Sequence, residues 1–382
     1  MEQIFAQYFY FNRNLETSEC KIYANWFIIE NIPEFAILKK IPQHKTHNCE
    51  GAVVMDHVKL SVQYAIDYFT NPKHNEDFDD CEIMIVLMAT LFHDIGKGVT
   101  TSIDNDDYNH SIEGEKITRK LLWDIGFYKR EYICKLVRYH MMPLIVLKKD
   151  NWFDDIINLS YECYGLRDLS LLKTFDIKGS KSSDINITEQ KLIELKAFVD
   201  VAKRIGVYYK KPLITPTTKL NKFYTNKNDF IDAVILIGLP GSGKSTYIKN
   251  HYNDDNYVII SRDIIRAELG YCKYGEKYLG DKQQEDIVSE IEKELLINAI
   301  KESKCVVIDN LNIRKKYRDL YKNLLKDYNI NWTYIYVEAP TIQDNISRKT
   351  NQIKEETIFD MIDKFDVPDI EEYDTFRVFV SK

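Results

Sequence analysis

The spacing of apolar residues divides the 382-residue chain into two parts. From about Asp56 to Tyr209, apolar side chains recur with helical spacing, most clearly over 83–92, 117–122 and 188–205. Few segments of this part alternate between apolar and polar residues with a period of two. The pattern therefore predicts that this first part is all-helical.

A different pattern begins near residue 230, where short apolar runs are separated by helical stretches. We interpret the runs as strands over 233–237, 257–260, 305–308 and 333–337. The most distinct helices between them are expected over 283–301 and 315–326. Buried strands that alternate with helices are typical of a parallel sheet covered by helices. We therefore predict a multidomain protein, an all-α domain followed by an α/β domain with a parallel sheet.

The segment 210–229 separates the two patterns and has the composition of a linker. It contains Pro212, Pro216 and several threonines and asparagines, which break regular structure. We accordingly predict a helical domain over 1–209, a linker over 210–229 and an α/β domain over 230–382. Residues 1 to about 50 are rich in aromatic side chains and could form an N-terminal cap on the helical domain.

Composition limits the classes of function. With 45% hydrophobic and 29% charged residues, the chain has the composition of a soluble globular protein, and no run of eighteen apolar residues predicts a membrane span. The net charge of −7 argues against strong non-specific DNA binding, although an enzyme that engages only a strand end needs no basic surface. Seven scattered cysteines and the lack of a signal-peptide pattern favour a cytoplasmic protein with reduced thiols.

The segment Gly238-Leu-Pro-Gly-Ser-Gly-Lys-Ser245 is a complete P-loop between an expected strand and an expected helix. Its glycines let backbone N–H groups close around phosphate oxygens. Lys244 would neutralise the β and γ phosphates, and Ser245 would place its hydroxyl on Mg²⁺. We predict that ATP, or another nucleoside triphosphate, binds with Mg²⁺ at Gly238, Gly241, Ser242, Gly243, Lys244, Ser245 and Thr246.

Four residues beyond the P-loop are candidates for phosphoryl transfer. Asp263, after the second expected strand, could accept the proton of an attacking hydroxyl, and Arg266 could grip a phosphate of the acceptor. Asp309 ends the third strand, where an acid commonly orders the magnesium shell. Arg348 stands where small P-loop kinases have a lid that closes over the γ phosphate. The alternatives are a helix cap with a surface arginine, a capped turn and a solvated basic helix face.

Taken together, the motifs GLPGSGKST, SRDIIR, VVIDNLN and SRK resemble those of the 5′-OH polynucleotide kinases of phage and bacterial RNA repair. The resemblance covers about Ile231 to Val380. The family commonly has a second lid arginine shortly after the first, but here Asn351, Gln352 and Lys354 follow. Either Lys354 substitutes for that arginine or one lid contact is lost.

The helical part contains a set of potential metal ligands. Four of the eight histidines belong to it, and helices of one bundle can bring distant side chains to one core site. Nitrogen and carboxylate donors together suit Mn, Fe, Co, Ni or Zn. The alternative for each histidine is a buried, hydrogen-bonded core residue. The set is His57, His93, Asp94, His110, His140 and Asp176.

This order of residues over about 56–176 resembles the HD phosphohydrolase superfamily. The resemblance implies that the ligands of a first metal are His57, His93, Asp94 and Asp176. His110 and His140 match the additional histidines of members with two metals. Lys97, in the variant His-Asp-x-Gly-Lys of the motif, would contact the substrate phosphate.

An HD domain followed by a polynucleotide kinase resembles the bacterial HD-Pnk end-healing proteins. The resemblance implies phosphorylation of 5′-OH ends of RNA or DNA and metal-dependent removal of 2′-, 3′- or 2′,3′-cyclic phosphates. No Lys-x-Asp-Gly motif of nucleotidyl transfer is present, so a separate ligase would seal the ends. Two alternatives stay open: a metabolite or nucleoside kinase fused to an HD nucleotidase, and a regulatory protein that senses a nucleotide.

Overall fold

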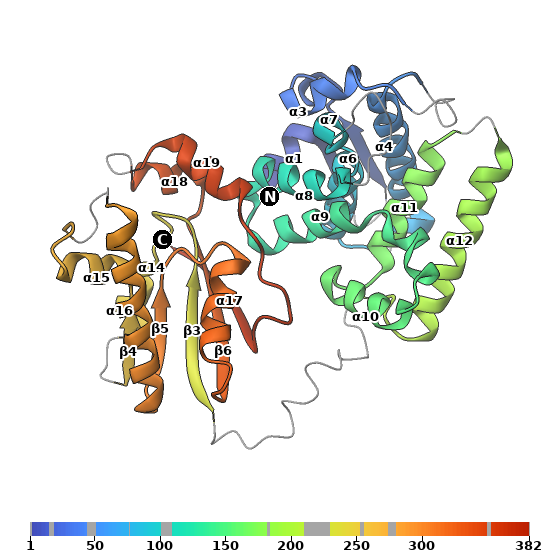
Figure 1. The fold of residues 1–382 in the computed structure, drawn as a ribbon. Coiled ribbons are helices and arrows are strands. Elements are labelled where there is room, and N and C mark those ends of the chain that lie inside the picture. Colours follow the sequence, from blue (N-terminus) through green and yellow to red (C-terminus); the bar gives the residue numbers. More distant parts are fainter. Residues whose placement is uncertain are drawn as a thin grey trace. The chain divides into compact units, whose positions relative to one another are not determined.

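The computed structural model forms two compact units, Met1–Thr217 and Thr218–Lys382 (Figure 1). The predicted linker, 210–229, lies outside the described residues. The residues that the structure describes are 2–14, 19–43, 51–75, 77–100, 109–181, 184–209, 230–252, 256–273, 280–349 and 353–381.

Unit 1 is a helical domain, as the sequence predicts. Its longer helices are α4 (Val54–Thr70), α6 (Asp80–Phe92), α8 (His110–Leu121), α9 (Phe127–Tyr139), α10 (Trp152–Glu162), α11 (Arg167–Gly179) and α12 (Ile185–Arg204). Its short helices are α1 (Glu2–Tyr8), α2 (Trp26–Ile29), α3 (Pro33–Ala36), α5 (Pro72–Asn75) and α7 (Lys97–Thr100).

Helix α6 forms the centre of unit 1. Its residues 83–92 are all buried, because α4, α9 and α11 pack around it. An N-cap at Asp79 starts the helix: the Asp79 carboxylate accepts from the Glu82 N–H at 2.7 Å. Within the described residues, the segment Asp80–Thr100 is long and apolar enough to cross a membrane, yet 78% of its apolar stretch is buried inside the unit. Helix α6 is therefore a core helix, and its C-cap is His93, one of the predicted metal ligands.

A β-hairpin at the N-terminus departs from the all-α expectation. Strands β1 (Phe9–Arg13) and β2 (Cys20–Ala24) pair antiparallel. Phe9, Cys20 and Ile22 of this hairpin are buried in the core of unit 1. The N-terminal segment is thus an integral part of the helical domain, and its five-residue strands are too short to give a clear period of two in the sequence.

Unit 2 confirms the predicted α/β domain with a parallel sheet. Five parallel strands lie in the order β4-β5-β3-β6-β7. The strands are β3 (Ile231–Ile237), β4 (Tyr257–Ile260), β5 (Cys305–Asp309), β6 (Ile330–Glu338) and β7 (Thr375–Val380). The helices are α14 (Lys244–His251), α15 (Arg262–Glu268), α16 (Lys282–Lys301), α17 (Lys315–Leu324), α18 (Ile342–Ser347) and α19 (Glu355–Asp363).

The topology places the functional candidates at one edge of the sheet. The carboxyl ends of parallel strands lie at the same edge, where ligands bind in such folds. The P-loop follows β3, Asp263 follows β4, and Asp309 ends β5. The strand β7 was missed from the sequence, because this edge strand is half-exposed along its length.

A buried ion pair ties α17 to the segment before β7. Arg318 donates from Nε to Glu372 at 2.7 Å and from Nη2 at 3.0 Å, while Nη1 donates to the Asn312 carbonyl at 3.0 Å. The Arg318 and Glu372 side chains are 0% and 3% exposed. The pair therefore fixes the turn after β5, which lines the cavity described below.

We predict that Glu372→Ala lowers the free energy of unfolding of unit 2 by about 3–5 kcal/mol, because it leaves the Arg318 charge buried and unpaired. Urea unfolding of the full chain, followed by hydrogen exchange of unit 2 peptides, measures this loss. The exposed neighbour Glu371→Ala is the control and should change stability by less than about 0.5 kcal/mol. A loss below about 1 kcal/mol for Glu372→Ala, the value of a surface pair, would contradict this account.

Candidate functional site

The P-loop of unit 2 requires glycine for steric reasons. Gly241 and Gly243 have φ angles of +76° and +97°, which side chains rarely adopt. A Cβ on Gly238 would lie 2.4 Å from the Val337 carbonyl oxygen. Helix α14 begins at Lys244, so its first N–H groups and the positive end of its dipole are available to an anion.

Backbone carbonyls of the P-loop hold Lys244. Its Nζ donates to the Gly238 oxygen at 2.7 Å and to the Leu239 oxygen at 3.1 Å. Burial lowers the pKa of Lys244 to about 8, although the nearby Asp309 and Asp263 oppose the shift. A bound triphosphate would supply the negative charge that this buried ammonium lacks.

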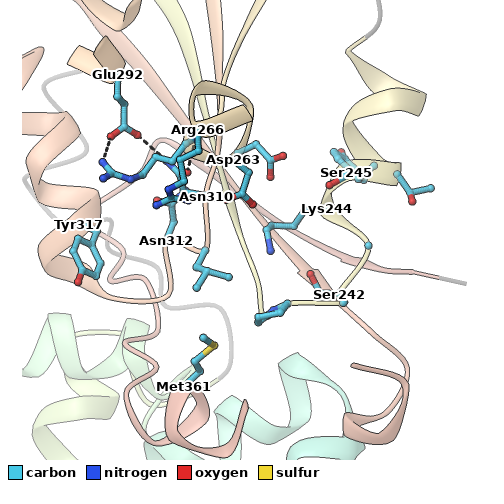
Figure 2. Close-up of a pocket in the computed structure, with 18 of the residues that line it drawn as sticks. Ser242, Lys244, Ser245, Asp263, Arg266, Glu292, Asn310, Asn312, Tyr317 and Met361 are labelled. Atoms are coloured by element: carbon cyan, nitrogen blue, oxygen red, sulfur yellow. Dashed lines mark hydrogen bonds and ion pairs between the residues drawn. The ribbon is translucent and has the colours of Figure 1, made fainter. Parts of the chain in front are cut away.

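A cavity of about 1680 Å³ opens beside the P-loop (Figure 2). Its volume exceeds the roughly 300–1,000 Å³ of a typical small-molecule site, so it has room for a donor and an acceptor together. Among the predicted nucleotide-binding residues, Gly238 does not line the cavity and instead lies beneath it. The predicted residues that do line it are Gly241, Ser242, Gly243, Lys244, Ser245, Thr246, Asp263, Arg266, Asp309 and Arg348.

Arg266 is engaged by two carboxylates. It donates to Glu285 from Nε at 2.8 Å and from Nη2 at 3.1 Å, and from Nη1 to Asp263 at 2.7 Å. Its hydrogen bond holds the pKa of Glu285 below the ordinary value. The Asp263 side chain lines the cavity and is 68% exposed. An acceptor phosphate at Arg266 would therefore have to displace Glu285 or Asp263.

A second group of polar side chains, missed from the sequence, forms the adjoining wall. Arg262 donates to Glu292 at 2.8 Å and to Glu285 at 2.6 Å. Asn310 donates to Glu292 and to the Tyr321 hydroxyl, each at 2.8 Å. Glu285 and Glu292 stand seven residues apart on α16, a spacing that puts both on one helix face and was the available signal.

Arg348 contacts the P-loop. Its Nη1 donates to the Gly241 carbonyl at 3.1 Å and to the Ser381 hydroxyl at 2.8 Å. Lys349 also lines the cavity, whereas Lys354 caps α19 and is not among the lining residues. Burial raises the pKa of Asp309, with Lys244 opposing the shift.

In unit 1, the predicted ligands converge around Asp94. The Asp94 Oδ2 atom lies 3.5 Å from Nε2 of both His57 and His93. Its Oδ1 atom lies 3.5 Å from His110 Nε2 and 4.0 Å from His140 Nε2. The two oxygens of one carboxylate thus each belong to a buried triad with two histidines.

Hydrogen bonds orient two of these rings. Nδ1 of His93 donates to the Thr90 carbonyl at 2.7 Å, and Nδ1 of His140 donates to the Val137 carbonyl at 2.8 Å. Because a carbonyl only accepts, Nδ1 of each ring carries the proton, and Nε2 presents its lone pair to the site. Burial lowers the pKa of His93 and holds that of His140 well below its ordinary value, which favours the neutral form that a metal ligand requires.

The nitrogen pairs have the separation of ligands on one cation. His57 and His93 have Nε2 atoms 3.1 Å apart, and those of His110 and His140 are 3.2 Å apart. Two nitrogens at 2.0–2.1 Å from a tetrahedral metal would be about 3.3 Å apart. Asp176 adds an oxygen 3.2 Å from His57 Nε2 to the first group. The donor set therefore fits a divalent cation at each of the two groups, and Asp94 belongs to both.

Two lysines neutralise the carboxylates of this site. Lys97 donates to Asp94 at 2.7 Å, and Lys173 donates to Asp176 at 2.6 Å. Burial opposes ionisation of Asp94, but Lys97 and the histidines hold its pKa well below the ordinary value. Lys173 is 4% exposed and was missed, because a lysine in an amphipathic helix normally indicates the solvent side.

Comparison with known proteins identifies both domains. Residues 52–157 match the model of the HD domain family, and residues 234–368 match that of the AAA domain family. The chain joins an HD domain to an AAA domain with a P-loop. Asp176 of the HD domain lies beyond the matched range.

Curated relatives resemble the chain over different extents. A protein of Acanthamoeba polyphaga mimivirus, named as a bifunctional polynucleotide phosphatase/kinase, is 26% identical over 330 residues, which cover 76% of this chain and 66% of the relative. The matched 76% of this chain is more than either unit contains, so the match extends over parts of both units. The L-seryl-tRNA(Sec) kinase of Methanococcus maripaludis is 33% identical over 145 residues, or 35% of this chain and 52% of the relative. The chain thus spans between about half and two thirds of the length of these relatives.

A chain of the solved Pnkp1/Rnl/Hen1 RNA repair complex aligns with 39% of this chain and 51% of its own length. The two are 21% identical in sequence, with a TM-score of 0.33.

We predict that the HD domain binds two equivalents of a divalent transition metal and that Asp94→Ala loses both, because this carboxylate belongs to both triads. His140→Ala should retain one equivalent. Elemental analysis after dialysis against Mn²⁺ or Co²⁺ measures the stoichiometry, with the exposed His74→Ala as the control. A single equivalent in the wild-type protein, unchanged in His140→Ala, would exclude the second cation.

Proposed function

We propose that the chain is a bifunctional enzyme that heals nucleic acid ends. The AAA domain phosphorylates 5′-OH ends with ATP, and the HD domain removes 2′-, 3′- or 2′,3′-cyclic phosphates. The observation that carries the proposal is the cavity of the AAA domain. It holds a P-loop lysine, an exposed aspartate and room for a second substrate beside the nucleotide. Similarity to a protein named as a polynucleotide phosphatase/kinase supports the same reading.

In the kinase reaction, Lys244 and the P-loop N–H groups hold the triphosphate, and Ser245 and Asp309 order Mg²⁺. The 5′-oxygen forms a bond to the γ phosphorus as the bond to the ADP oxygen breaks. Asp263 takes the proton of the hydroxyl. Arg266 binds the acceptor, and Arg348 moves from Gly241 to the charge that develops on the γ phosphoryl group.

In the hydrolase reaction, the residues that hold the cations are His57, His93, Asp94, His110, His140 and Asp176. A divalent cation bound there supplies hydroxide near neutral pH and neutralises charge on phosphoryl oxygens. Lys97 and Lys173, which donate to Asp94 and Asp176, would supply positive charge to the substrate phosphate. The water oxygen forms a bond to phosphorus as the ester bond breaks, and the released 2′- or 3′-oxygen takes up a proton. A 2′,3′-cyclic phosphate needs two such hydrolyses, the first to a monoester and the second to free phosphate.

The two reactions together prepare a strand break for sealing. Cleavage of RNA often leaves a 5′-OH and a 2′,3′-cyclic phosphate, whereas ligation needs a 5′-phosphate and a free hydroxyl at the other end. RNA ends are accordingly the proposed substrates, with a separate ligase downstream. We place the enzyme in the cytoplasm, in keeping with the six described cysteines, all of them free thiols.

A second candidate activity is phosphorylation of a hydroxyl on an aminoacyl-tRNA. It is favoured by the 33% identity of 145 residues to L-seryl-tRNA(Sec) kinase. A side-by-side assay with a 5′-OH oligonucleotide and with seryl-tRNA separates the two candidates, since each predicts transfer to only one acceptor.

For the kinase, Asp263→Asn should lower kcat for a 5′-OH oligonucleotide by about 10²–10⁴-fold, because the positioned base is lost. End-labelling with γ-labelled ATP measures the rate. The exposed Asp286→Asn on α16 is the matched control and should retain the wild-type rate. A near-normal rate for Asp263→Asn would remove the general-base role.

For the hydrolase, His93→Ala should abolish metal-dependent release of phosphate from 2′-, 3′- and 2′,3′-cyclic ends, because the cation loses a ligand. The kinase rate of the same variant should be unchanged, since the AAA domain is a separate unit. His74→Ala serves as the control. If the wild-type protein releases no phosphate from any of these ends with Mn²⁺, Co²⁺, Ni²⁺ or Zn²⁺, the HD domain has another function.

A further inference from the structure

The order of the strands gives the cavity of the AAA domain a direction. Asp263 follows β4 at one side of the sheet, the P-loop follows the central β3, and Phe379 belongs to β7 at the other side. In-line transfer puts the attacking and leaving oxygens on opposite sides of the γ phosphorus. Since Asp263 marks the attacking side, the nucleoside of the donor lies on the β7 side.

Side chains on the β7 side suit that nucleoside. His251 stacks on Tyr247 with ring centres 4.0 Å apart, and Phe379 packs edge-on against Tyr247 at 4.8 Å. All three line the cavity. His251 is therefore part of the donor end. The region beyond Asp263 is left for the acceptor.

At that acceptor end, α17 presents an apolar surface to the cavity. Tyr317 and Leu320 are three residues apart on one helix face, line the cavity and are 46% and 63% exposed. Figure 2 shows Tyr317 at the left of the view and Lys244 to the right of centre, with Arg266 and Asp263 above them. Tyr321, on the next turn, is fixed by its hydrogen bond to Glu292 at 2.8 Å, which holds this face of α17 towards the cavity.

Positive charge accompanies this surface. The exposed Lys316 places Nζ 4.7 Å from the centre of the Tyr317 ring. Lys293 of α16 also lines the cavity, and its Nζ donates to Glu290 at 2.7 Å. An exposed aromatic ring beside ammonium groups matches a single strand, whose bases stack on aromatic side chains and whose phosphates bind cations.

We propose that Tyr317 and Leu320 form the subsite for the 5′-terminal nucleobases of the acceptor strand, with Lys316 binding a phosphodiester of that strand. This inference rests on the proposed kinase activity and deepens it. The acceptor is a polynucleotide end recognised through the face of a base, without a requirement for base identity, because every base has a face that can stack.

The test measures acceptor KM at saturating ATP for a 5′-OH oligonucleotide and for the same strand with an abasic 5′-terminal nucleotide. Tyr317→Ala should raise KM for the normal strand by about 5- to 150-fold, the value of one stacked base. It should have much less effect on the abasic strand. Tyr317→Phe keeps the ring and should restore the wild-type KM, and the KM for ATP should stay constant in all variants.

Leu320→Ala should raise KM for the normal strand less than Tyr317→Ala does. Leu295→Ala is its control, a leucine on α16 that is 39% exposed and not among the residues lining the cavity.

An unchanged KM in Tyr317→Ala, with normal wild-type kinase activity, would overturn the subsite and leave the kinase proposal standing. An equal loss on normal and abasic strands would make Tyr317 a structural residue. A wild-type protein that phosphorylates no strand would overturn both proposals.

Discussion

A buried charge is stable only beside a partner of opposite sign, and this requirement governs both domains. Asp94 pairs with Lys97 and Asp176 pairs with Lys173 in the HD domain. In the AAA domain, Arg266 pairs with Glu285, and both side chains are partly buried. In each pair, one residue occupies the position of the proposed ligand. The lysine ammonium groups lie where a metal cation would bind, and the Glu285 carboxylate lies where a phosphate would bind. In the proposed function, ligand binding is therefore an exchange of ion partners within a preformed site.

The candidate sites of the two domains suit ligands of opposite charge, because different chemical groups line them. The HD domain collects lone pairs of histidine nitrogens around one carboxylate, which attracts cations. The AAA domain collects backbone N–H groups, Lys244 and arginines, which attract phosphates. In the proposed function, the first set activates water against a phosphate ester, and the second set holds a phosphate for transfer.

Local motifs could be predicted from the sequence, whereas distant partners could not. The P-loop and His93-Asp94 are contiguous, so they were recognisable and their surroundings matched the expected strand and helix. The Arg266–Glu285 and Lys173–Asp176 pairs were missed, because charged residues on amphipathic helices normally face solvent. The N-terminal hairpin was missed because its five-residue strands are too short to establish a period of two, and β7 was missed because it is a half-exposed edge strand.

The central claim is that one chain converts both ends of a strand break. Its most direct test is the intact mass of one RNA oligonucleotide with a 5′-OH and a 2′,3′-cyclic phosphate, after incubation with the full chain, ATP, Mg²⁺ and Mn²⁺. The account predicts a single product that has gained a 5′-phosphate and carries hydroxyls at its 2′ and 3′ positions. An oligonucleotide unchanged at both ends, under conditions in which the protein still consumes ATP, would contradict it.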